Sequence, residues 1–306
     1  MTFSRALLCS ALMRVQVVRR APLVLRLGAF LVDKDYPGGY KLLRAAERRG
    51  WLRKVVRYRL SDTVTLDVPI FRPENRWTAG HVAEYERELV DELSAAVRDA
   101  ATTPVFVDCG ADIGTISARV AAAAARVGRV IAIEPNPDAQ VFLERNMGRL
   151  PADARVVRAA VADFSGRGRL RRPSPDADHH AQYLEPAPDG DVAVVRIDDL
   201  AIDPGGSVVM KLDLEGGERA ALKGAMETLR RAREFTVASE AHPDVVDRTG
   251  DEPVDIVRLI TGVRPCTVTV PEVPGLEVDL GRPLFAQIPA PERMGYNVVC
   301  RSEAAA

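Results

Sequence analysis

The sequence predicts an α/β fold with a mostly parallel sheet and helices on both of its faces. Three observations support this prediction. Short apolar runs rich in β-formers occur at 105–107, 130–133, 156–160, 208–212 and 235–238. Helical patterns separate them around 115–126, 137–149 and 216–232, and this alternation is typical of βαβ units. The runs lack polar alternation, which indicates strands covered on both sides, and the tail adds two candidate strands near 265–270 and 296–300.

Charge divides the chain into two parts. Residues 1–60 contain 14 Lys and Arg against 3 Asp and Glu, a net charge of +11, whereas the remainder contains 28 against 40, a net charge of −12. The total of −1 favours no general affinity for nucleic acid, but the basic segment indicates an anionic surface or partner. We expect a basic, mostly helical extension over 1–78 and a ligand-binding domain over 79–306.

Several elements are expected in the extension and its junction. Apolar residues at helical spacing predict one or two basic helices over 1–32, broken near Pro22: Leu8, Ala11, Leu12, Val15 and Val18. A turn at 36–40 precedes a helix over 41–49. The stretch 53–71 suggests a short hairpin, 79–100 a long amphipathic helix, and 172–190 a surface loop.

The composition favours a cytoplasmic protein. The four cysteines have no metal-ligand spacing and are interpreted as reduced thiols: Cys9, Cys109, Cys266 and Cys300. Arginines interrupt the apolar stretch from 7 to 32, so it suits neither a membrane span nor a signal peptide. Peripheral contact with the inner face of a membrane through residues 1–32 stays open.

The stretch from Val105 to Gly114 is the strongest chemical signal. A buried strand ends in Asp108, and a turn containing Gly110 and Gly114 then opens a helix. Glycines there let the backbone approach a ligand and let the helix pack on the strand. The next strand ends in Glu134, which suits the ribose hydroxyls of a nucleoside.

One residue of this turn favours S-adenosylmethionine (SAM) over a dinucleotide. Asp112 stands where the middle glycine of a dinucleotide loop lies against pyrophosphate, and a carboxylate would repel that group. The sulfonium and ammonium of SAM are compatible with Asp108 and Asp112. Asp163, after the third strand, is a candidate for the adenine amino group or a simple turn residue.

Charged residues also end the fourth and fifth strands. Lys211, Asp213 and Glu215 alternate onto one face of the fourth, and Glu240 and His242 end the fifth. Charges of this kind are costly inside a covered sheet but tolerable at its carboxyl edge, where α/β folds bind ligands.

Two roles are open for this edge. His242 is a candidate general base toward a substrate hydroxyl. Alternatively, Asp213, Glu240 and His242 hold a divalent metal such as Mg²⁺, which lowers the pKa of the hydroxyl. A third interpretation is a structural ion-pair network, with Glu215 and Glu218 capping the following helix.

The order of these motifs resembles the FkbM-type methyltransferases over about residues 103–245. The segments that carry the resemblance are Val107-Asp-Cys-Gly-Ala-Asp-Ile-Gly114, Ile133-Glu-Pro-Asn-Pro137, Arg196-Ile-Asp-Asp-Leu200, Lys211-Leu-Asp-Leu-Glu-Gly-Gly-Glu218, Leu222-Lys-Gly224 and Glu240-Ala-His242.

The resemblance implies a class I methyltransferase fold, which is Rossmann-like with a seven-stranded sheet and an antiparallel last strand. It implies SAM contacts at Asp108, Gly110 and Glu134. It also implies active-edge roles for Lys211, Asp213, Glu215 and Glu240, and methyl transfer to oxygen on sugar-bearing acceptors. Asp112 departs from the family, where asparagine is more common.

Two functions are compared further. The first is an O-methyltransferase acting on a glycan, glycolipid or glycosylated metabolite. The second is a non-catalytic module with the same fold, which binds an anionic polymer or membrane through its basic extension. That extension is alternatively a homodimer arm, a cover for the acceptor pocket or a solvated helix. His179 and His180 border the acceptor site or are plain surface residues.

Overall fold

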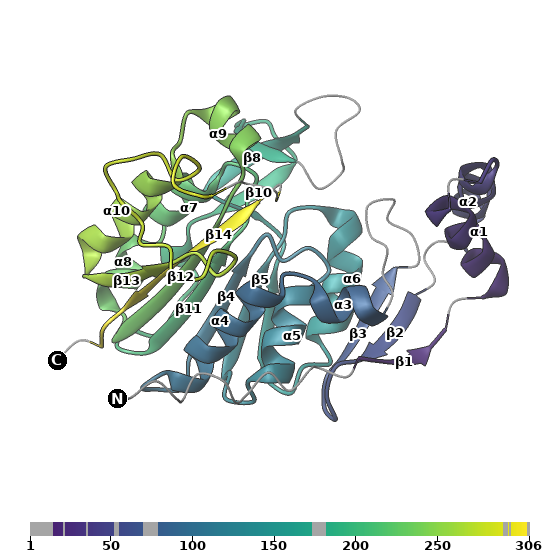
Figure 1. Ribbon diagram of the computed structural model, residues 1–306, viewed down its shortest axis with the longest axis horizontal. Helices are drawn as coiled ribbons and strands as arrows, with labels where there is room; N and C mark the ends of the chain where they lie inside the picture. The colour runs from purple at the N-terminus through teal and green to yellow at the C-terminus, as the bar shows by residue number, and fades with distance from the viewer. Residues whose placement is uncertain are drawn as a thin grey trace. The chain divides into compact units, whose positions relative to one another are not determined.

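The protein is described here by a computed structural model, in which residues 15–20, 22–34, 36–51, 55–69, 79–172, 182–289, 293 and 295–304 have a described placement (Figure 1). Contacts divide the chain into two compact units, Met1–Arg87 and Glu88–Ala306. The boundary predicted from the sequence lies after residue 78 instead. Residues 1–14 of the basic helices predicted over 1–32 and the loop histidines His179 and His180 lie outside the described residues.

The first unit contains a small antiparallel sheet of order β1-β2-β3, formed by Gln16–Arg19, Val55–Arg59 and Thr65–Pro69. The hairpin predicted over 53–71 is thus confirmed. Asp67 is fully buried on β3, and its Oδ1 accepts a 2.6 Å hydrogen bond from Arg57 on β2. The expectation that Val18 is helical is wrong, because the β-branched run at 17–18 pairs with β2 as a strand.

The described residues of this unit also include three helices: α1 (Leu23–Asp33), α2 (Gly39–Arg48) and α3 (Ala79–Glu84). The helix over 41–49 is confirmed as α2, and α1 begins just after Pro22, but the described residues before Pro22 form a strand and not a helix. The single helix predicted over 79–100 is two helices, α3 and α4 (Arg87–Asp99). Glu86 has a φ of 43°, which a continuous right-handed helix does not allow, so the chain turns there.

The second unit is built on a seven-stranded sheet of order β13-β14-β12-β11-β4-β5-β6. Its strands are β4 (Val105–Cys109), β5 (Arg129–Ile133), β6 (Asp153–Val157), β11 (Ser207–Leu212), β12 (Glu234–Ala241), β13 (Cys266–Thr269) and β14 (Tyr296–Ser302). β14 runs antiparallel to both of its neighbours. All six residues of β11 are buried, so both faces of the sheet are covered at its centre. The predicted fold class is confirmed.

The helices of this unit connect successive strands: α5 (Thr115–Ala123), α6 (Pro137–Met147), α7 (Glu218–Lys223), α8 (Met226–Arg231), α9 (Pro243–Thr249) and α10 (Pro253–Val263). The helix predicted over 216–232 is interrupted between α7 and α8. A Cβ on Gly224 would lie 2.2 Å from the carbonyl oxygen of Ala162, so the interruption brings the two backbones together.

A second, four-stranded sheet follows β6 and was not predicted. Its order is β7-β10-β8-β9, with β7 (Ala160–Val161), β8 (Gly166–Arg171), β9 (Tyr183–Pro186) and β10 (Val192–Val195). The loop predicted over 172–190 is therefore wrong at β9. Arginine and glycine in β8 hide the apolar alternation that identifies a strand, and pairing with β9 and β10 supplies its hydrogen bonds instead.

The thiols of Cys109, Cys266 and Cys300 are free and form no disulfide. Among the described residues, no helix has the length and apolar character needed to cross a lipid bilayer.

Candidate active site

The turn after β4 is held by its two glycines. Gly110 has a φ of 76°, and a Cβ there would lie 1.9 Å from the backbone oxygen of Asp213. Gly114 has a φ of 84°, and its Cβ would lie 2.6 Å from Cε of Met147 on α6. Any other residue would be strained at both positions, and at Gly110 it would also clash with backbone. The turn therefore lies directly against the end of β11 and packs on side chains of α6.

Glu134 joins this turn to the end of β5. Its Oε2 accepts a 2.8 Å hydrogen bond from the backbone N–H of Asp112, and its Oε1 accepts one of 2.8 Å from Asn136. Asp112 has a φ of 48°, so its N–H points at Glu134 in a backbone conformation that few residues adopt. The structure thus brings the predicted ribose acid and the predicted glycine turn together at one point.

Asp108 lies below the turn and has no exposed surface. Its Oδ2 accepts a 2.6 Å hydrogen bond from the Ser117 hydroxyl on α5. Its Oδ1 lies 3.7 Å from Nζ of Lys211 and has no hydrogen-bond partner within the described residues. Burial raises the pKa of Asp108, while the charge of Lys211 opposes that rise.

A row of ionisable side chains, Lys211, Asp213, Glu240 and His242, begins at this lysine. The buried Lys211 Nζ donates to Asp213 Oδ2 at 2.8 Å and to the Gly110 oxygen at 3.3 Å. Burial by itself raises the pKa of Asp213, but the charge of Lys211 and hydrogen bonds with Glu240 and Lys211 lower it to about 2. Asp213 is therefore ionised at all physiological pH values.

The chain ends at His242. Its Nε2 lies 3.0 Å from Oε1 of Glu240, and the imidazole is 23% exposed against 4% for the Lys211 side chain. The chain is thus buried at its lysine end and partly exposed to solvent at its imidazole end. An imidazole held by a carboxylate has the arrangement of an oriented general base.

The geometry favours the base over the metal. Within the part of the chain that is described, no group of three or more His, Cys, Asp or Glu side chains is arranged to hold a metal ion. The carboxylate oxygens that a metal would need are already bonded, Asp213 Oδ2 to Lys211 and Glu240 Oε1 to His242. The predicted magnesium site finds no support in this donor set.

Glu215 and Glu218 have different roles in the loop between β11 and α7. Burial and, to a smaller extent, the negative charge of Asp213 raise the pKa of Glu215 to about 7. Its backbone oxygen accepts a hydrogen bond from Arg248, whose guanidinium lies 5.0 Å from the ring centroid of Tyr183. Glu218 instead accepts hydrogen bonds from the backbone N–H groups of Leu214 and Gly216, which closes the loop. A structural role for Glu218 fits these contacts.

Asp163 lies apart from this chain of contacts. It is exposed in the turn between β7 and β8. Its predicted contact with adenine stays a prediction.

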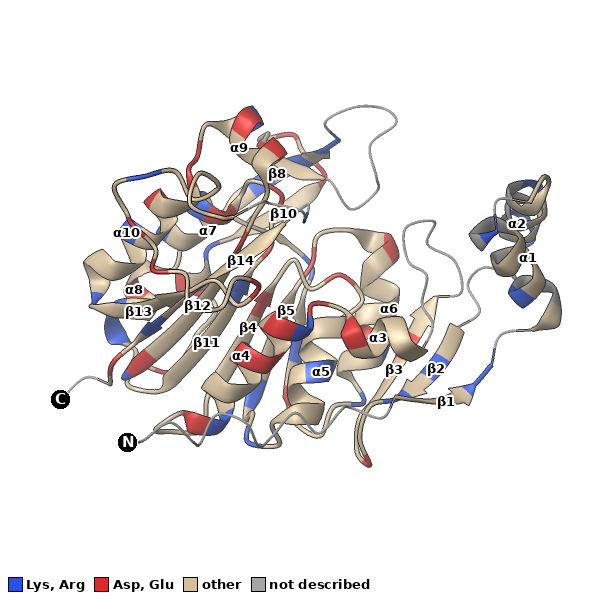
Figure 2. Ribbon diagram, viewed as in Figure 1, with Lys and Arg blue, Asp and Glu red and all other residues tan. Residues whose placement is uncertain are grey.

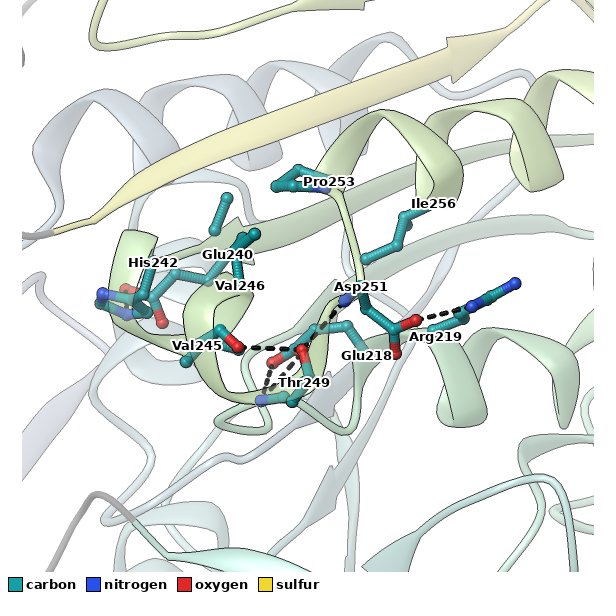
Figure 3. A pocket seen from close by; sticks show the side chains of 12 residues that line it. Glu218, Arg219, Glu240, His242, Val245, Val246, Thr249, Asp251, Pro253 and Ile256 are labelled. Atoms are coloured by element: carbon teal, nitrogen blue, oxygen red, sulfur yellow. Dashed lines mark hydrogen bonds and ion pairs between the residues drawn. The ribbon is translucent and has the colours of Figure 1, made fainter. Parts of the chain in front are cut away.

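A small pocket adjoins the end of the charged chain (Figure 3). Glu240 and His242 lie at one side of it, and an ion pair of 2.6 Å between Arg219 and Asp251 lies at the other (Figure 3). Apolar side chains between them come from α9 and α10: Val245, Val246, Pro253 and Ile256. The pocket is therefore half polar and half apolar beside the candidate base.

Sequence reasoning missed several residues that shape this site. A Cβ on Gly295, just before β14, would lie 2.6 Å from Cε1 of His242 and 3.1 Å from Oε1 of Glu240. Ser117 and Arg248 were missed as well. Their roles depend on contacts between distant segments, and only the position of Ser117 one turn into the helix after the glycine turn offered a local signal.

Comparison with known families gives one match. The sequence model of the methyltransferase FkbM domain matches residues 108–264, just over half of the 306 residues. The match spans the glycine turn, the charged chain and His242. A comparison with curated protein sequences finds no match.

Several solved structures are similar at low sequence identity. The methyltransferase FkbM of Methylobacillus flagellatus is 21% identical, with 64% of this chain and 42% of that chain covered and a TM-score of 0.41. The precorrin-6y C5,15-methyltransferase of Geobacter metallireducens is 16% identical, with coverages of 71% and 89% and a TM-score of 0.38. The tRNA (uracil-54, C5)-methyltransferase of Pyrococcus abyssi, solved with S-adenosyl-L-homocysteine, is 13% identical, with coverages of 81% and 44% and a TM-score of 0.39. The chain thus spans less than half of the FkbM protein that it matches.

Proposed function

The chain belongs to the FkbM family of SAM-dependent methyltransferases, and from that premise we propose that it methylates a hydroxyl group of a sugar-containing acceptor. The observation that carries the proposal is the charged chain from Lys211 to His242, which ends in a partly exposed imidazole beside a pocket. A sugar hydroxyl is a poor nucleophile until its proton is leaving, so a base at this place has a clear use.

The residues present fit SAM. Glu134 would hold the ribose, the turn from Gly110 to Gly114 would lie along the cofactor, and Asp163 would lie near the adenine. The buried Asp108 Oδ1 lacks a hydrogen-bond donor within the described residues, and together with Asp112 it adds negative charge suited to a cationic amino-acid end. When bound, SAM supplies a methyl group already activated by its positive sulfonium.

The protein's own groups then have separate tasks. His242 takes the proton from the acceptor hydroxyl. Glu240, bonded to Nε2, orients the imidazole and stabilises its protonated form. Lys211 holds Asp213 from the buried side, Asp213 shares a hydrogen bond with Glu240, and Glu215 positions the acceptor. Alignment of the hydroxyl and exclusion of water supply the rest of the rate.

The test begins with the acceptor. Purified protein is incubated with labelled SAM and a panel of sugars, nucleotide sugars and lipid-linked glycans, and products are identified by mass spectrometry. With an acceptor in hand, His242→Ala should lower kcat by about 10²- to 10⁴-fold with little change in SAM affinity, because a base acts only in the chemical step.

A matched pair refines this experiment. Glu240→Gln should also lower kcat, whereas Glu227→Gln, on the exposed face of α8 beside Arg230, should leave it unchanged. Full activity of both His242→Ala and Glu240→Gln would refute the assignment of the base. The non-catalytic alternative predicts SAM binding without turnover on any acceptor. It is disfavoured because a scaffold gains nothing from burying Lys211 and Asp108.

A further inference from the structure

Exposed large apolar side chains are concentrated in the first unit. The described residues contain eight such side chains, and Val141 on α6 is the one that lies outside residues 17–51. Single exposed apolar residues are ordinary, but a concentration of them marks a binding surface. The seven in the first unit are Val17, Val18, Leu23, Leu27, Phe30, Tyr36 and Trp51.

Three large apolar side chains of α1 lie together on an exposed face. Leu23, Leu27 and Phe30 follow one another at intervals of four and three residues, so they share one face, and they are 78%, 54% and 53% exposed. Gly28 lies on a different face and is buried. A helix in a globular protein normally buries its large apolar side chains. Here α1 presents them to solvent.

The segment that contains this face is also basic. Residues 15–51 contain eight Lys and Arg against three Asp and Glu, and the blue segments recur on β1, α1 and α2 in Figure 2. The exposed ones are Arg19, Arg20, Arg26, Lys34, Lys41, Arg48 and Arg49. The Arg49 guanidinium lies 5.7 Å from the ring centroid of Trp51. Arginine with tryptophan and exposed leucine and phenylalanine is typical of a membrane interface.

We propose that these exposed residues of the first unit, Leu23, Leu27, Phe30 and Trp51 with Arg19, Arg20 and Arg26, form a surface that docks the protein on an anionic lipid membrane. Its apolar side chains enter the headgroup region, and its arginines pair with anionic lipid. A soluble anionic polymer would bind the arginines but would leave the apolar side chains exposed to water. A second copy of this face would set seven exposed cations against seven more. The docking is independent of the proposed methyl transfer.

Vesicle flotation of the full-length protein tests this proposal. The protein should float with vesicles of phosphatidylcholine and phosphatidylserine and only weakly with phosphatidylcholine alone. The variant Leu27→Ser with Phe30→Ser should lower binding to the anionic vesicles at least about tenfold, because two apolar side chains no longer leave water. Val141→Ser, an equally exposed apolar residue outside the surface, should bind like wild type.

A second variant tests the charge. Arg19→Gln, Arg20→Gln and Arg26→Gln together should remove the preference for phosphatidylserine, at about fivefold per arginine. Several outcomes overturn the proposal: no flotation of wild type, flotation unchanged by the Leu27 and Phe30 substitutions, or lipid-free self-association in ultracentrifugation that those substitutions abolish. Unaltered circular dichroism verifies that the variants fold. SAM binding by calorimetry is measured separately, so failure here leaves the proposed function standing.

Discussion

The two compact units depart from the usual distribution of side chains in opposite ways. The second unit buries charge at the carboxyl edge of its sheet, where Asp108 and Lys211 have almost no exposed surface. The first unit exposes apolar side chains on α1, where Leu23 and Phe30 face solvent. Ordinary globular proteins do neither without a reason. We therefore propose that each departure marks the part of its unit that meets another molecule.

The two departures differ in what they cost the fold. A buried charge needs partners inside the protein, and Lys211 has three: Asp108, Asp213 and the Gly110 carbonyl. An exposed apolar side chain needs no internal partner. We therefore expect substitutions at the buried edge to change stability strongly, and those on α1 to change binding with little effect on stability.

The largest effect is expected for Lys211→Met, which removes the cation between the buried Asp108 and the partly buried Asp213. The free energy of unfolding should fall by about 3 to 5 kcal/mol in urea denaturation followed by circular dichroism. Adding Asp108→Asn should recover part of that loss, because one uncompensated charge disappears. A loss below about 1 kcal/mol, or no recovery in the double variant, would mean that the charges are not coupled as the structure shows.

A somewhat smaller effect is expected for Glu134→Ala. It removes the acceptor for the Asp112 and Asn136 N–H groups and the predicted acceptor for the ribose, so the dissociation constant for SAM should rise about ten- to a hundredfold in calorimetry. Glu144→Ala, on the same side of the sheet but bonded to Arg158 at the surface, is the control. Unchanged affinity in the first variant would remove Glu134 from the cofactor site.

The contribution of Glu215 to the free energy of unfolding should depend on pH. Its pKa is about 7 in the folded protein against an ordinary 4.5, so the unfolded chain loses this proton first. Its contribution therefore falls as the pH rises from 4.5 to about 7, and it is least favourable above that window. Glu215→Gln should raise the free energy of unfolding by about 1 to 2 kcal/mol above pH 7, a value reduced because solvent screens this partly exposed carboxylate. Below pH 4.5 the substitution should change the free energy of unfolding little. Melting curves over this range check the prediction; a gain that does not depend on pH would contradict it.

The smallest effect on stability is expected on α1. Leu27→Ser with Phe30→Ser should change the free energy of unfolding by no more than about 0.5 kcal/mol per site, because both side chains already face water. Urea denaturation measures it. A loss of several kcal/mol would show that these side chains pack inside the protein, and the contrast between the two units would disappear.

The main sheet could be predicted because its signals are local. Each buried strand is a short apolar run, and Asp108, Glu134, Lys211 and Glu240 lie at or next to strand ends in the sequence itself. The small sheet could not be predicted, because the arginines of β8 conceal its alternation. The interruption between α7 and α8 was missed for a similar reason, since Gly224 is explained only by its closeness to Ala162.

The sequence by itself determined the fold class, the glycine turn and the set of charged residues at the sheet edge. Parallel strands bring their carboxyl ends to one side of a sheet, so residues at those ends can be assigned to one edge. Only the tertiary structure decided how those charges are partnered. It buried Asp108 against Ser117, ordered Lys211, Asp213, Glu240 and His242 into one chain, and left Leu27 and Phe30 facing water. Partnering depends on distances between segments far apart in the chain, and neither residue type nor spacing encodes those distances.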